Sequence, residues 1–181
     1  IGAGASRRSA RSIAGIATVD GWTLGTTAGT NELRATSGTL TGSPVSFTAT
    51  GTVGAASTVT STVSTSNAAR VSGEQAIITV DLIDAFGNPL TASGGTVALS
   101  TNIGTLGAVT NAGDGSYTAT YTATAAGAAT ITATINGATI VDNATITVTA
   151  GAAASVAVNA GDGQSATVGT PVAIDPSVVV R

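Results

Sequence analysis

Residues 76–90 read AIITVDLIDAFGNPL, an alternating run followed by a turn-forming stretch. Within the run, Ile78, Val80 and Leu82 fall on one face of an extended chain, and Thr79 and Asp81 fall on the other. Alternation of period two predicts a β-strand with one buried face and one solvent-facing face. The order of strand and turn therefore predicts that the chain reverses direction directly after a half-buried strand.

The turn itself contains Asp84, Gly87, Asn88 and Pro89. Glycine and asparagine tolerate a positive φ, and proline fixes its own φ, so these residue types favour a tight reversal. A carboxylate at the start of such a turn can accept hydrogen bonds from the backbone that follows it. We interpret these four residues as a structural turn that Asp84 caps.

A Ca²⁺ site is the alternative interpretation of the acidic residues near this turn, with Asp81, Asp84 or Asp114 as ligands. Calcium takes six to eight oxygen ligands. The acidic residues of this chain are spread singly, without an alternating acidic run. We therefore expect no cofactor and keep Ca²⁺ as the weaker alternative.

The same alternation recurs along the chain, with small apolar residues facing threonine. Stretches rich in glycine, asparagine and aspartate separate the alternating runs, as expected of turns. Between residues 54 and 150 the pattern predicts seven strands, at roughly 56–64, 75–84, 95–101, 105–109, 116–122, 128–136 and 138–149. Seven short strands in a segment of this length predict an all-β fold, an immunoglobulin-like β-sandwich.

The chain also repeats itself with a period of about 98 residues. Gly29 aligns with Gly127, and Ser57 aligns with Ser155. Tandem similarity at a fixed period indicates a repeat architecture. We therefore predict three parts. Residues 1–53 form the C-terminal half of an Ig-like repeat, residues 54–150 form a complete repeat, and residues 151–181 form the N-terminal strands of a further repeat.

Composition excludes several classes of function. The 181 residues carry a net charge of −3 and contain no histidine, cysteine or methionine. Without histidine a serine triad cannot form, and we expect no enzyme. The one basic cluster, Arg7, Arg8 and Arg11, is too small to indicate nucleic-acid binding. No run approaches the roughly 20 apolar residues of a membrane-spanning helix.

The stretch VDLIDAFGNPL resembles the strand and turn of bacterial Ig-like repeats of the invasin and intimin type. GIATVDGWTLGTTAGTNELRAT looks like the second half of such a repeat, and NAGDGSYTATYTATAAGAATITATING is similar both to this family and to filamin-type repeats. The resemblance covers nearly the whole chain after residue 12. It implies a bacterial extracellular protein at the cell surface: an adhesin stalk, a surface-layer component or a filament.

Two explanations remain open for the partial repeats at the two ends. The chain is a window on a longer tandem array, or the tail of one subunit pairs with the head of the next. Strand addition of the second kind joins chains through backbone hydrogen bonds, and a head-to-tail contact that does not close builds a filament. Val178, Val179 and Val180 are the candidate self-assembly strand, and the expected partner is the protein itself.

An adhesin module that binds a host receptor or a glycan through its loops is the alternative function. Loops carry binding in many sandwich domains. Trp22 could stack on a sugar if it is exposed, but we expect it to pack into a sandwich. Tyr117 and Tyr121 share one strand face, and we expect core packing with their hydroxyl groups at the rim.

Overall fold

A computed structural model describes residues 10–13, 15–19 and 21–180. These residues form strands, turns and extended segments and contain no helix. Across the same residues there is accordingly no helix with the length and apolar character that a membrane crossing requires.

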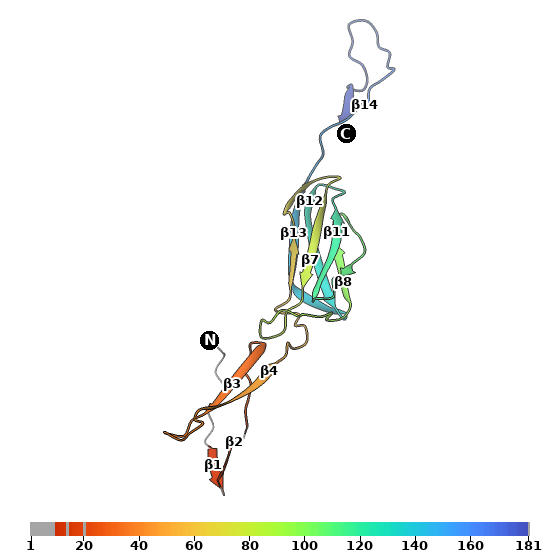
Figure 1. The fold of residues 1–181 in the computed structure, drawn as a ribbon. Coiled ribbons are helices and arrows are strands. Elements are labelled where there is room, and N and C mark those ends of the chain that lie inside the picture. The colour runs from red at the N-terminus through yellow and green to blue at the C-terminus, as the bar shows by residue number, and fades with distance from the viewer. Residues whose placement is uncertain (1–9, 14, 20, 181) are drawn as a thin grey trace.

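Two sheets pack face to face in the middle of the chain (Figure 1), and we call this unit the central sandwich. The first sheet has the order β10–β11–β7–β5, with β9 also paired to β11. Its strands are β5 (Thr62–Thr65), β7 (Gln75–Asp81), β9 (Thr105–Leu106), β10 (Thr110–Asn111) and β11 (Ser116–Thr122).

The second sheet has the order β6–β13–β12–β8. Its strands are β6 (Ala69–Val71), β8 (Val97–Thr101), β12 (Gly127–Ile135) and β13 (Ala138–Thr149). All pairs in the two sheets are antiparallel except β6 with β13, which is parallel. The observed architecture confirms the prediction of an all-β, immunoglobulin-like sandwich.

The core lies between the inner faces of these two sheets. Alternate residues of β7, β11, β12 and β13 are buried, as the sequence alternation predicted. Ile78, Val80, Ile131 and Ile146 have no exposed surface, and alanines fill the space between them. Burial of each large aliphatic side chain contributes about 1.5–3 kcal/mol, so this one interface supplies most of the stability of the sandwich.

The first predicted strand, 56–64, is wrong over most of its length. The amide of Ser61 donates to the carbonyl oxygen of Ser57 at 3.1 Å, so the chain makes a turn there and β5 begins only at Thr62. Sequence analysis also missed β6 and β10. Both are too short to show alternation, and β6 exists because its backbone pairs with β13 in the opposite sheet from β5.

Three two-stranded hairpins flank the sandwich. β1 (Ala10–Ile13) pairs with β2 (Ile16–Val19), β3 (Gly29–Ala35) pairs with β4 (Val45–Gly51), and β14 (Val156–Ala160) pairs with β15 (Ser177–Val180). We call β3–β4 the N-terminal hairpin and β14–β15 the C-terminal hairpin. Figure 1 shows them beyond opposite ends of the central sandwich.

Candidate functional site

The turn after β7 is built around the carboxylate of Asp84, which is only 2% exposed. Its Oδ1 accepts hydrogen bonds from the amides of Phe86 and Asn88, both at 2.9 Å. Its Oδ2 accepts from the amide of Gly54 at 3.0 Å. The Gly54 amide has the largest effect among the donors that lower the pKa of Asp84 to about 2, because each stabilises the ionised form.

The side chain of Asn88 connects this turn to a segment about 60 residues earlier. Its Nδ2 donates to both carboxylate oxygens of Asp84, at 3.1 and 2.9 Å, and to the carbonyl oxygen of Thr26 at 2.8 Å. Its Oδ1 accepts from the amide of Ala28 at 2.8 Å. Because residues 26–28 lead directly into β3, we call these contacts the junction between the N-terminal hairpin and the central sandwich.

Two local features shape the partners of this junction. Gly87 has φ +87°, the left-handed conformation that favours glycine, and its amide closes the turn on the Asp84 carbonyl at 3.1 Å. On the other side, Asn31 accepts from the Gly25 amide at 3.0 Å and donates to the Gly29 carbonyl at 3.2 Å. The backbone around Thr26 is therefore held in shape from within its own hairpin.

The four predicted turn residues thus lie together, but the sequence did not predict the role of the Asn88 side chain. Asn88 was expected to matter for its tolerance of positive φ, whereas the structure gives it a long-range side-chain contact. Pro89 forms an isolated bridge with Ile83 at the base of the turn. No local sequence signal identifies residues 26–28 as the partner of Asn88, apart from the repeat period that places a hairpin before the sandwich.

The candidate calcium ligands are not gathered into a cluster. Asp81 lies exposed on β7, and Asp114 accepts from the hydroxyl of Ser116 at 2.6 Å, the main reason that its pKa is lowered. Both oxygens of Asp84 already face N–H donors. Nowhere in the described part of the chain do three acidic side chains come together in a way that could hold a metal ion.

The candidate assembly strand forms most of β15. Val178, Val179 and Val180 pair with Val158, Ala157 and Val156 of β14. Because the sheet has only these two strands, β15 has one paired edge and one edge without a strand partner among the described residues.

The three aromatic residues singled out from the sequence differ in their surroundings. Trp22 is half-buried, and its indole Nε1 is buried without a hydrogen-bond partner among the described residues. The Tyr117 hydroxyl donates to the Gly95 carbonyl at 2.7 Å and lies 3.0 Å from the Ser93 hydroxyl. The Tyr121 hydroxyl has no partner in the described structure, and burial raises its pKa. Tyr121 is therefore fully inside the core, not at the rim.

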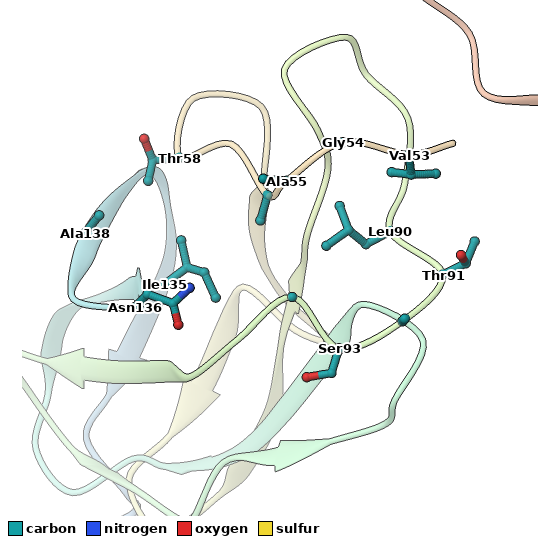
Figure 2. A pocket seen from close by; sticks show the side chains of 13 residues that line it. Val53, Gly54, Ala55, Thr58, Leu90, Thr91, Ser93, Ile135, Asn136 and Ala138 are labelled. Atoms are coloured by element: carbon teal, nitrogen blue, oxygen red, sulfur yellow. The ribbon is translucent and has the colours of Figure 1, made fainter. Parts of the chain in front are cut away.

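A groove of about 450 Å³ lies beside the junction, and Figure 2 shows the residues that line it. Residues 53–56, which follow β4, form one wall, and residues 90–94 form another. Ile135, the last residue of β12, and Asn136 of the following turn close it. The lining is small and mixed in polarity and carries no charged side chain, so sequence analysis had no motif by which to find it.

Comparison with known proteins finds one matching family and several matching solved structures. The family described as invasin, domain 3, matches residues 55–151, which is the central sandwich. No curated protein sequence matches the chain. Solved structures of bacterial adhesins do match it.

The Escherichia coli adhesin FdeC is 29% identical, with a TM-score of 0.54, over 76% of this chain and 47% of that one. The Yersinia pseudotuberculosis adhesin InvE is 28% identical, with a TM-score of 0.52, over 59% of this chain and 31% of that one. Invasin, a bacterial integrin-binding protein, is 27% identical, with a TM-score of 0.50, over 76% of this chain and 29% of that one.

The fold and the family match define a bacterial Ig-like domain of the adhesin type. The chain belongs to the invasin domain 3 family, a non-enzymatic family of surface adhesins. The predictions of family, of non-enzymatic character and of location at the cell surface are confirmed by these matches. The chain spans about a third to a half of the length of the structures that it matches.

Proposed function

We propose that this chain is a structural segment of a surface rod or filament, built from Ig-like repeats joined end to end. In this proposal residues 54–150 are one complete repeat. Residues 1–53 are the C-terminal half of the repeat before it, and residues 151–181 supply the first strands of the repeat after it. The mechanism is mechanical: short antiparallel strands transmit load, and threonine-rich outer faces keep the rod hydrated.

One observation carries the proposal. In the central sandwich, β5 pairs with β7 and sets Val63 opposite Val80, and both side chains are buried. In the C-terminal hairpin, β14 pairs with β15 and sets Val158 opposite Val178, yet both are 61% exposed. Both pairs of strands are antiparallel and set valines opposite one another, but among the described residues no second sheet covers the apolar face of the C-terminal hairpin.

The N-terminal hairpin supports the same conclusion. Phe47 of β4 aligns with Ile146 of β13 in the repeat, and Ile146 is fully buried whereas Phe47 is 52% exposed. Burying apolar surface of this kind contributes about 25 cal/mol per Å², so an uncovered sheet face favours association. The N-terminal hairpin would be completed by the early strands of a repeat, and the C-terminal hairpin by the late strands. Each hairpin therefore supplies the kind of strands that the other one lacks.

Two sources can supply the missing half: flanking repeats of the same chain, or the hairpin of a second copy. The second source is strand complementation, in which β15 and its neighbours join the N-terminal hairpin of the next subunit. Such a contact is head-to-tail and open, and repeats into a filament. Both sources give the same rod of sandwiches, and they differ in whether the links are covalent.

Sedimentation and electron microscopy of the chain at increasing concentration test the complementation form of the proposal. We expect head-to-tail oligomers that Val178→Asp abolishes, because a charge on the covered face opposes burial. Val168→Asp is the matched control, since Val168 is fully exposed and outside both strands of the hairpin. A chain that stays monomeric at every concentration would exclude complementation and leave the covalent array.

Adhesion is the second candidate function, favoured because InvE and FdeC are adhesins and invasin is an integrin-binding protein. The groove beside the junction is the place where a receptor loop or a glycan would bind. Screening the chain against a glycan array and immobilised integrin tests it. Binding that is lost in Leu90→Asp, at the groove wall, would support adhesion. Binding that is lost in Trp22→Ala alone would place the site elsewhere.

A further inference from the structure

We infer that residues 124–127 form a docking surface for the Asp-x-x-Gly-Asn-Pro turn of a following Ig-like repeat. The inference rests on the proposed rod and adds to it the specific contact by which one repeat holds the next. It starts from the junction already described, where the Asn88 carboxamide binds the Thr26 carbonyl and the Ala28 amide, each at 2.8 Å.

The segment that receives Asn88 recurs at the other end of the sandwich. Residues 26–29 read TTAG and residues 124–127 read TAAG, at the repeat offset of 98. The two segments are also similar in backbone conformation, since Gly29 has φ +126° and Gly127 has φ +143°. Both values lie in the region that favours glycine, so each segment enters its strand through the same kind of glycine conformation.

Both segments also occupy the same place in their hairpins. Gly29 opens β3 and pairs with Gly51, the last residue of β4. Gly127 opens β12 and pairs with Val148, one residue before the end of β13. In each case the segment lies beside the point where the chain leaves the hairpin for the next unit. Figure 1 shows the second of these points at the end of the sandwich that faces β14.

The linkers that follow the two hairpins are alike. Gly54, whose amide donates to Asp84, begins the sequence GAAS. Gly151 begins the sequence GAAAS after β13. A following repeat would therefore find both partners of the turn: a glycine amide for its aspartate, and a threonine carbonyl with an alanine amide for its asparagine.

Exposure differs between the occupied segment and the free one at a single position, since Thr26, Thr27 and Gly29 are exposed like their counterparts. Ala28 is half-buried at the junction, whereas residues 124–127 are all exposed. The Thr124 carbonyl accepts from the Ser72 hydroxyl at 3.1 Å, and a carbonyl oxygen has a second lone pair for another donor. The occupant has to present a carboxamide that donates and accepts at once, which is the chemistry that Asn88 supplies at the first junction.

Amide hydrogen exchange, read by NMR, tests the inference on an extended chain. Residues 1–181 are followed in one polypeptide by a second copy of residues 84–150, which completes the third repeat and supplies its turn. We expect exchange at the Ala126 amide to slow by at least about tenfold relative to the chain of 181 residues, as for one added hydrogen bond. Replacing only the appended copy of Asn88 by alanine should remove this slowing.

An internal control lies in the same molecule: Asn88→Ala in the first copy should speed exchange at Ala28 and leave Ala126 unchanged. If amides of β15 slow in the extended chain but Ala126 does not, the repeat completes without the contact, and the docking surface is refuted while the rod survives. If the β15 amides do not slow either, the repeat has not completed, and both proposals fail.

Discussion

The two tyrosines of β11 allow the same chemical change to be made twice with opposite expected results. Tyr121→Phe removes a hydroxyl group that is buried without a hydrogen-bond partner in the described structure. Burial of an unpaired hydroxyl costs about 1–3 kcal/mol. Part of the gain is lost because the missing oxygen leaves a small cavity. We therefore expect a net stabilisation of about 1 kcal/mol, which raises the Tm of a domain of this size by about 4–8 °C.

Tyr117→Phe is the matched control, on the same strand and the same inward face. It removes the donor to the Gly95 carbonyl at 2.7 Å and the contact with the Ser93 hydroxyl at 3.0 Å. Loss of such bonds costs about 0.5–1.5 kcal/mol, and more if the carbonyl is left buried and unpaired. The free energy of unfolding of each variant is measured by urea titration at neutral pH, and the Tm by calorimetry.

Measuring stability at alkaline pH gives an independent test of the burial of the Tyr121 hydroxyl. Burial raises its pKa in the folded state, whereas the unfolded chain ionises at about 10. Ionisation of Tyr121 therefore leaves stability unchanged below about pH 10 and lowers it as the pH rises from there through the folded-state value. Tyr121→Phe should lack this part of the alkaline decline. If Tyr121→Phe destabilises the protein as much as Tyr117→Phe does, the reasoning about its unpaired hydroxyl is refuted.

Two further predictions concern the turn and a half-buried glycine beside the core. The pKa of Asp84 falls from its ordinary 3.8 to about 2 on folding, so its contribution is complete above about pH 4 and is lost as the pH falls towards 2. Urea unfolding between pH 2 and 5 should show this decline in the wild type and a flatter curve for a less stable Asp84→Asn. Gly104 and Gly113 have φ +86° and +87°, but only at Gly104 would a Cβ meet the Tyr121 ring, at 2.5 Å. Gly113→Ala should therefore cost about 1–2 kcal/mol and Gly104→Ala about 1–3 kcal/mol more, and equal Tm shifts for the two would contradict the packing.

Some features of this protein follow from the sequence alone. Alternation in β7, β11, β12 and β13 assigned the buried face of each strand correctly, because a period of two leaves only one face that can avoid water. The stretch DAFGNPL predicted a turn after β7 from the conformational limits of its own residues. These are local properties, and no distant contact is needed to specify them.

Other features were decided by the tertiary structure. The short β6 is a strand because β13 lies beside it, and Tyr117 and Tyr121 differ because Gly95 and Ser93 reach only the first hydroxyl. Likewise, the role of Asn88 depends on residues 26–28, about 60 positions away in the chain. A hydrogen bond requires a partner within about 3 Å, and only the folded chain determines which distant groups come that close.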